Sequence, residues 1–349
     1  MYPQLVDDYE AILRRARPLI DVRSPVEFAR GKLPDAVNLP LLADEERDAV
    51  GKEYKARGRD AAVALGQRLV AGDVKAERIA AWHDFAVAHP EAVITCWRGG
   101  LRSEIAQTWL AEAGVELPRV AGGVKALRRF GLDVIAESST QRRLVLVGGR
   151  TGTGKTLVVR KAPVHVDLEA LANHRGSAFG GFPTPQPPPV TFENALAATL
   201  LRLPASAPIV VEDESRTIGR LALPEPLYRA MGRAPIALLE VDHAQRVDNI
   251  YQEYVVDAAE PHQHLPARLE RIEPRLGGVR YREVAALMDS AFEATDPDEQ
   301  RAAHHHWIER LLRYYYDPMY DYQLKGKMDR VVMRGGVDEV TAYLRTLES

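Results

Sequence analysis

The sequence is poor in cysteine, with a single one, Cys96, among 349 residues. One cysteine excludes an internal disulfide bond, and CxxC zinc sites are absent as well. No run of about 18 apolar residues occurs, so no membrane-spanning helix is predicted. The first residues have neither a basic segment nor an apolar one, so we expect no signal peptide. These absences favour a cytoplasmic protein without a membrane partner, in which the thiol is kept reduced.

An excess of positive charge is also lacking, because 46 basic residues face 49 acidic ones and the net charge is −3. Both halves of the chain are nearly balanced, so a nucleic-acid site would have to be a local patch. The length suggests two domains. The polar segment 136–142 is interpreted as a linker, which predicts domains at residues 1–137 and 138–349.

Short apolar runs alternate with helical patterns in the first domain, which is typical of an α/β fold. We expect its strands at residues 19–22, 92–95 and 119–121. The Pro-rich stretch 182–189 cannot form a central strand or a helix interior. We interpret this stretch as a stiff surface connector, with the edge of a lid as the alternative.

The surroundings of Cys96 indicate chemistry rather than an inert buried thiol. An apolar strand leads to it, a Gly-rich loop with Arg98 and Arg102 follows, and a helix is expected from Ser103, which would cap it. A helix N-terminus and nearby guanidinium groups both stabilise a thiolate. Backbone N–H groups in such a loop also bind anions. We therefore predict a reactive thiol with an anion site beside it.

A second strand–loop–helix unit opens at Arg143 with the apolar strand 144–147. The P-loop pattern GxxxxGKT follows at once, from Gly149 to Thr156. Its glycines allow backbone N–H groups to face a phosphate, Lys155 supplies a positive charge, and Thr156 can bind Mg²⁺. The pattern predicts a polyphosphate site, but it does not identify the molecule that carries the phosphates.

The apolar run 209–211 ends in Glu212, Asp213 and Glu214. In P-loop proteins such a strand carries an acid toward Mg²⁺. Asp213 or Glu212 is therefore a candidate metal ligand, and a solvated strand end is the equally weighted alternative.

Three further segments carry basic, aromatic or histidine side chains. Arg268, Arg271 and Arg275 fall on one helical face and are a candidate contact for a nucleic-acid backbone, with a solvated face as the alternative. Tyrosines in residues 310–316 could stack on bases, but we favour a core role for part of that segment. Adjacent histidines at 304–306 point in different directions on a helix, and we interpret them as structural.

Two segments resemble the rhodanese family. They are residues 20–40 (IDVRSPVEFARGKLPDAVNLP) and the loop from Cys96 to Arg102. Rhodaneses often have His and Gly where this chain has Lys32 and Asp35. The resemblance implies a chalcogen-handling Cys96.

Resemblance to a second family runs from about residue 19 to residue 323. The segments 167–180, 212–219, 245–250 and 316–324 resemble the tRNA 2-selenouridine synthase family, in which a rhodanese domain precedes a P-loop domain. The resemblance implies a rhodanese-like α/β domain, then a P-loop NTPase-like α/β domain with a helical C-terminal part. It also implies a transferase acting on tRNA at the wobble 2-thiouridine. In that reaction geranyl diphosphate alkylates the sulfur, and selenium from selenophosphate then replaces the geranylthio group.

The resemblance also implies roles for individual residues. Cys96, Arg98 and Arg102 would serve the selenium stage, with Cys96 either carrying selenium or expelling the thiol. Mg²⁺ would bind Thr156 and Asp213. The other implied partners are tRNA and the enzyme that produces selenophosphate. The expected diphosphate-binding residues are Gly149, Gly152, Thr153, Gly154, Lys155 and Thr156.

Further candidate substrate contacts come from the residues themselves. His174, Arg175 and Ser177 lie in a Gly-flanked stretch and are interpreted as substrate contacts, with a structural turn as the alternative. Arg216 and Arg246 are candidate mobile arginines that meet phosphate, and a surface ion pair is the equally weighted alternative for each.

Two other functions compete with this one. The first is a rhodanese-type sulfurtransferase coupled to a P-loop domain that uses ATP or GTP. The second is a nucleotide-gated binding module with an inactive rhodanese fold, which the intact Cys96 loop disfavours.

Overall fold

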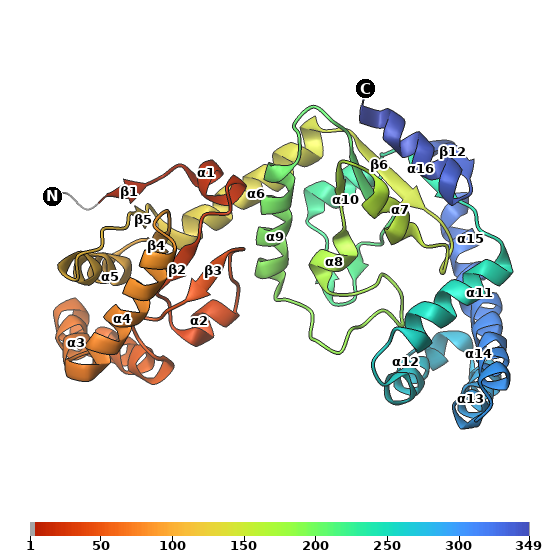
Figure 1. Ribbon diagram of the computed structural model, residues 1–349, viewed down its shortest axis with the longest axis horizontal. Helices are drawn as coiled ribbons and strands as arrows, with labels where there is room; N and C mark the ends of the chain where they lie inside the picture. The colour runs from red at the N-terminus through yellow and green to blue at the C-terminus, as the bar shows by residue number, and fades with distance from the viewer. Residues whose placement is uncertain (1–3, 349) are drawn as a thin grey trace. The chain divides into compact units, whose positions relative to one another are not determined.

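Two parallel five-stranded sheets organise the chain, each in its own unit (Figure 1). The computed structural model describes residues 4–348, so the first three residues of the predicted first domain lie outside the described part. One unit runs to Ala136 and includes Pro188–Arg202; the other comprises Glu137–Pro187 and the chain from Leu203 onward. The predicted boundary thus falls beside the observed one, but residues 188–202 belong to the first unit.

The first unit has the strand order β1-β5-β4-β2-β3, with every pair parallel. The expected strands are confirmed within one or two residues. Its core is apolar and includes the fully buried Trp82, Ile94 and Leu110. The elements are β1 (Leu5–Val6), α1 (Tyr9–Arg14), β2 (Leu19–Asp21), α2 (Pro25–Ala29), β3 (Ala36–Asn38), α3 (Asp44–Leu69), α4 (Gly72–Ala88), β4 (Val93–Thr95), α5 (Leu101–Glu112), β5 (Arg119–Val120), α6 (Gly123–Gln141) and α9 (Pro189–Arg202).

Helix α6 runs through the polar segment that was expected to be a linker, so that prediction is wrong. Polar residues 136–141 continue the helix because none of them is proline or glycine, and propensity does not stop it there. Residues 182–188 form no helix or strand, as expected for a connector. Helix α9 follows, and its Asn194 and Thr191 bond to the backbone of Lys32.

The second unit has the strand order β12-β11-β6-β8-β7, also parallel. Its sheet elements are β6 (Leu144–Gly148), α7 (Lys155–Lys161), β7 (His165–Val166), α8 (Leu168–Ala172), β8 (Ile209–Glu212), β9 (Thr217–Ile218), β10 (Leu221–Ala222), α10 (Glu225–Met231), β11 (Ile236–Leu239), β12 (Val331–Gly335) and α16 (Val337–Arg345). Strands β9 and β10 form a separate antiparallel pair.

A helical part lies between β11 and β12, and it has an apolar core of its own (Figure 1, teal to blue). It comprises α11 (His243–Tyr251), α12 (Pro261–Leu276), α13 (Gly278–Glu293), α14 (Pro297–Leu311) and α15 (Asp317–Lys325), with π-helical turns at Gln252–Val256 and Leu312–Tyr316. Among the described residues, no helix is long and apolar enough to span a membrane.

Candidate active sites

The thiol loop joins β4 to α5 in the first unit. Cys96 is buried, and its Sγ lies 3.3 Å from Ser103 Oγ. Ser103 Oγ also donates to the carbonyl of Gly100, the N-cap residue of helix α5, and no side chain in the described part of the chain caps that helix. The expected start of the helix at Ser103 is therefore wrong, since α5 begins at Leu101 and Ser103 faces the thiol from the first turn.

Gly99 holds the loop in a conformation that needs glycine. Its φ is +63°, and a Cβ there would lie 2.5 Å from the carbonyl oxygen of Val120 and 2.8 Å from the nitrogen of Gly123. The Cys96 carbonyl accepts a hydrogen bond from Val124 N–H at 2.9 Å. These contacts fix the loop at the N-terminus of α5, where the helix dipole favours anions.

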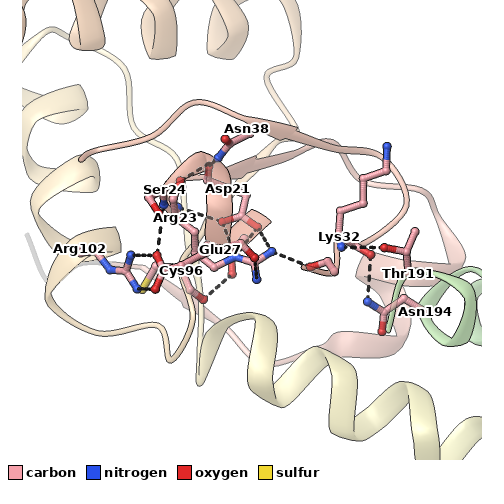
Figure 2. A network of polar contacts seen from close by, with 12 residues as sticks. Asp21, Arg23, Ser24, Glu27, Lys32, Asn38, Cys96, Arg102, Thr191 and Asn194 are labelled. Carbon is pink, nitrogen blue, oxygen red and sulfur yellow. Dashed lines mark hydrogen bonds and ion pairs between the residues drawn. The ribbon is translucent and has the colours of Figure 1, made fainter. Parts of the chain in front are cut away.

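The two arginines of the loop differ in their surroundings. Arg98 is exposed, whereas Arg102 is half-buried and both its terminal nitrogens donate to Glu27 (Figure 2). Burial raises the pKa of Glu27, but the bonds from Arg102 and the Ser24 N–H and the charge of Arg47 outweigh it, so the pKa is lowered. An ionised carboxylate thus positions Arg102, and Arg98 is the arginine that solvent reaches.

A buried ion pair supports this loop from strand β2. Asp21 is fully buried and Arg23 is 2% exposed, with Arg23 Nη2 2.7 Å from Asp21 Oδ2. The guanidinium also donates to the carbonyl of Gly31, and the Asn38 amide donates to both backbone carbonyls of the pair (Figure 2). The pair therefore anchors both ends of α2, the helix that carries Glu27.

The P-loop lies between β6 and α7, as its sequence pattern predicts. Gly152 has φ +84°, and a Cβ there would lie 2.7 Å from the carbonyl oxygen of Arg246. Lys155 Nζ donates to the carbonyl of Gly149 at 2.8 Å, so the lysine folds back over the loop. Thr153 is 2% exposed, and its hydroxyl donates within the loop to the carbonyl of Arg150 at 2.8 Å.

Arg246 holds the loop from helix α11. It is 2% exposed, its Nε donates to the Thr151 carbonyl at 2.9 Å, and its terminal nitrogens pair with Asp317. Asn249 donates to the Gly152 carbonyl at 2.8 Å. The expectation of a mobile arginine or a surface ion pair at position 246 is therefore wrong, because both partners fix this guanidinium in the interior.

Two glutamates that the sequence analysis did not select, Glu169 and Glu214, interact with each other near the end of the P-loop. Glu169 Oε2 accepts a hydrogen bond from Thr156 Oγ1 at 2.7 Å, and its other oxygen accepts from Gly176 N–H. Burial and the adjacent Glu169 raise the pKa of Glu214 to about 8, although the charge of Lys155 lowers it. Because the negative charges of Glu169 and Glu214 repel each other, one of the two carboxyl groups keeps its proton to a higher pH than usual. The positive charge of the nearby Lys155 is therefore not enough to neutralise both carboxylates.

The neighbouring acids of strand β8 have other partners. Glu212 is fully buried and accepts from Leu168 N–H, and its second oxygen has no partner among the described residues. Burial, followed by the charge of Asp167, raises the pKa of Glu212 well above its ordinary value. Asp213 forms an ion pair with Lys327 at 2.7 Å, so a metal at Asp213 would have to compete with that ammonium group.

The segment from His174 to Ser177 is brought to the P-loop through Glu169, which binds Gly176. Arg175 pairs with Glu253 and stacks on Phe182 and Tyr254. Ser177 Oγ lies 2.8 Å from Tyr254 OH. Three of the four expected substrate contacts thus lie close to the phosphate loop.

His174 is the third of these residues, and Arg216 is the fourth expected contact. Burial lowers the pKa of His174, whose Nδ1 has no partner in the described part of the chain. Arg216 is exposed and pairs with Glu225 of α10. Among the described residues, no hydrogen bond or ion pair joins Arg216 to Glu169 or Glu214.

The candidate nucleic-acid residues are partly structural. Arg268 donates to the backbone carbonyls of Phe179 and Gly181, so its guanidinium is not available to the proposed nucleic-acid backbone contact. Arg271 is exposed. Core packing of residues 310–316 is confirmed by the buried Leu311, Leu312, Tyr315 and Tyr316. His304 is structural as expected, because it is buried and accepts from Trp307 Nε1 at 2.9 Å.

Comparison with known proteins matches both units. A model described as the tRNA 2-selenouridine synthase AAA domain matches residues 142–349, and a Rhodanese-like domain model matches residues 5–129. Three relatives bear the name tRNA 2-selenouridine synthase. Those from Marinobacter nauticus and Cupriavidus pinatubonensis are each 45% identical and the one from Bordetella bronchiseptica is 48% identical, over 97–98% of this chain and 96–98% of theirs.

The chain belongs to the tRNA 2-selenouridine synthase family. The predicted order of a rhodanese-like α/β domain and a P-loop α/β domain is confirmed, and the helical part of the second domain lies between β11 and β12. In this member of the family the thiol loop and the P-loop are both intact. Glu169 and Glu214 could have been noticed from sequence, because both lie in the segments that carry the family resemblance.

Replacing Asp21 by alanine should strongly destabilise the rhodanese-like domain. The change leaves the buried Arg23 charge without its partner, which costs about 3–5 kcal/mol of unfolding free energy. Urea unfolding followed by the fluorescence of the tryptophans of this domain measures the loss. The control is Asp84→Ala, whose side chain is 85% exposed and whose loss should cost at most about 0.5 kcal/mol. Equal effects of the two changes would contradict the role of the pair.

The stability of the P-loop domain should fall as pH rises from about 4.5 to about 8 in the absence of divalent cations. Glu214 has a raised pKa in the folded state, so over this range the unfolded chain loses the proton first and is favoured. Thermal unfolding between pH 5 and 9 should show a shallower decline for Glu214→Gln than for the wild type. Glu225→Gln is the control, because hydrogen bonds from Arg216 and Arg229 lower the pKa of Glu225 and keep it ionised throughout. Parallel wild-type and Glu214→Gln profiles would refute the assignment.

Proposed function

We propose that this protein is a transferase that converts wobble 2-thiouridine in tRNA to 2-selenouridine through an S-geranyl intermediate. The observation that carries the proposal is the pairing, in one chain of this family, of an intact thiol loop with an intact P-loop. Each loop suits one half of the chemistry. The P-loop suits a diphosphate leaving group, and the thiol loop suits exchange of a chalcogen.

In the first stage the thiocarbonyl sulfur of 2-thiouridine attacks C1 of geranyl diphosphate, and diphosphate leaves. N–H groups of the P-loop and Lys155 would receive the negative charge that develops on the leaving group. Lys155 now bonds to the Gly149 carbonyl, which a phosphate oxygen would replace as its partner. Arg175, held by Glu253 and two aromatic rings, would border the same site.

A magnesium ion fits the residues beside the P-loop. The raised pKa of Glu214 marks a deficit of positive charge that a cation would relieve. Thr156, Glu169 and Glu214 would hold the ion, and Asp213 is the original candidate now paired with Lys327. No cluster of three or more such acidic, histidine or cysteine ligands occurs among residues 4–348, so phosphate oxygens and water would complete the shell. When bound, the ion would stabilise the departing diphosphate.

In the second stage selenium replaces the geranylthio group at C2. The C2–S bond breaks, a C2–Se bond forms, and geranylthiol leaves with a proton. Overall, S-geranyl-2-thiouridine, selenophosphate and water give 2-selenouridine, geranylthiol and phosphate. Cys96 serves this exchange, and the exposed Arg98 with the loop N–H groups would bind the phosphate of selenophosphate.

Magnesium should raise the unfolding temperature of the wild type at pH 8 by several degrees, because it binds only the folded carboxylate pair. Glu214→Gln should lose most of this increase, since it removes one of the two charges. Differential scanning calorimetry with and without Mg²⁺ provides the measurement, and Glu225→Gln serves as the exposed control. An undiminished increase in Glu214→Gln would place the ion elsewhere.

Separate loss of the two stages is the direct test of the proposed function. Nucleosides from a 2-thiouridine-containing tRNA are analysed by mass spectrometry after incubation with protein, Mg²⁺, geranyl diphosphate and selenophosphate. Cys96→Ala should accumulate S-geranyl-2-thiouridine, with selenation reduced at least 100-fold. Lys155→Ala should reduce geranylation about 100-fold, because one transition-state contact is lost. Lys52→Ala, on the exposed face of α3, should resemble the wild type.

An unchanged nucleoside profile with folded wild-type protein would reject the proposal. The P-loop pattern by itself identifies a polyphosphate and not its alcohol, so ATP or GTP consumption would then be measured. Nucleotide turnover with sulfur transfer from a thiosulfonate would favour the sulfurtransferase alternative.

A further inference from the structure

A cavity of about 410 Å³ lies in the rhodanese-like domain beside the thiol loop. Its walls come from the segment after β3, from α3 and from α5. Most of the lining side chains are aliphatic or aromatic, and none is acidic. Leu101, Ile105 and Trp109 line one side because they are spaced four residues apart on α5.

The cavity begins where the thiol loop ends. Leu101 and Arg102 line it, and they directly follow Gly100, whose carbonyl accepts from Ser103 in contact with Cys96 Sγ. Leu101 is 37% exposed and Tyr54 on the α3 side is 59% exposed. The structure thus leaves apolar side chains exposed next to the thiol loop, and a sizeable exposed apolar surface is a feature of binding sites.

We propose that this cavity binds the geranyl chain of the S-geranyl-2-thiouridine intermediate during the selenium stage; the inference rests on the proposed function. A ten-carbon chain needs roughly 300 Å³, at about the volume of one water molecule for each carbon. The cavity can contain such a chain, and its mostly aliphatic and aromatic lining suits a hydrocarbon. Arg59 and Arg102 are the charged members of the lining, and guanidinium groups suit the phosphates of an RNA chain outside the cavity.

Binding the chain here would place C2 of the modified uridine toward the thiol loop. It would also retain the intermediate, because an apolar chain that is buried in protein must be exposed to water again to leave. The chain then becomes the apolar part of the departing geranylthiol. In this account the cavity distinguishes the geranylated RNA from its unmodified precursor.

Gly66 offers a way to fill the cavity without disturbing the fold. It lies on α3 and lines the cavity, and a Cβ there would have one neighbour within 4 Å, Val50 Cγ2 at an ordinary 3.7 Å. Gly66→Phe would place an aromatic ring in the cavity, and loss of a helical glycine also favours the helix. Ala64→Phe adds the same ring to an exposed position of the same helix and serves as the matched control.

The test measures the affinity of the full-length protein for two anticodon stem-loop RNAs, which carry S-geranyl- or S-methyl-2-thiouridine. Wild type and Ala64→Phe should bind the S-geranyl RNA at least tenfold more tightly than the S-methyl RNA. Gly66→Phe should reduce this preference to less than threefold, and it should slow conversion of S-geranyl RNA to 2-selenouridine at low RNA concentration. Thermal unfolding checks that the Gly66→Phe protein remains folded.

Other outcomes overturn the inference and show where it fails. A wild-type preference that persists in Gly66→Phe would place the chain elsewhere while leaving the proposed function intact. Loss of geranylation by Gly66→Phe, with normal selenation of preformed S-geranyl RNA, would assign the cavity to geranyl diphosphate instead. If wild type fails to convert S-geranyl RNA to 2-selenouridine, the proposed function and this inference both fail.

Discussion

Both candidate sites depend on one constraint of parallel sheets. A strand that must return in the same direction ends in a short loop, and the helix that follows presents its unpaired N–H groups at that edge. The thiol loop between β4 and α5 and the P-loop between β6 and α7 are two instances of this arrangement. In each, a glycine with positive φ lets the backbone pass where a Cβ would collide with a neighbouring strand or helix. The same geometry therefore places unpaired backbone N–H groups beside Cys96 in one domain and at the P-loop in the other.

Each domain has a buried arginine–aspartate ion pair that supports its loop directly or through one further contact. Arg246, paired with Asp317, donates to the Thr151 carbonyl of the P-loop. Arg23, paired with Asp21, holds helix α2, whose Glu27 accepts from Arg102 at the end of the thiol loop. Both guanidinium groups also donate to backbone carbonyls, which satisfies their remaining hydrogen bonds in the interior. This arrangement leaves other charged groups, such as Arg98 and Lys155, at the open side of each loop. The residues that support each loop are thus different from the charged residues that a ligand could reach.

The two domains contrast in the environment that they offer a substrate. Around the P-loop, the carboxyl groups of Glu169 and Glu214 compete for a proton, and the magnesium ion is proposed to bind there. Around the thiol loop, an acid-free apolar cavity opens beside α5. A reaction that first releases diphosphate and later releases an apolar thiol would use these environments in that order. The proposed chemistry thereby gives a physical reason for joining the two domains in one chain.

The sequence alone determined the features that are local along the chain: the two glycine loops, the strands that precede them, and the order of the domains. Such features depend on neighbouring residues and on period, so a contiguous pattern is enough to predict them. Tertiary structure decided what depends on distant residues. Glu169 meets Thr156 and Glu214, Arg246 meets Asp317, and helix α9 packs with the first unit although it follows the P-loop. Likewise, the cavity beside Cys96 exists only because α3 and α5 pack with space between them, and packing volume leaves no periodic signal in a sequence.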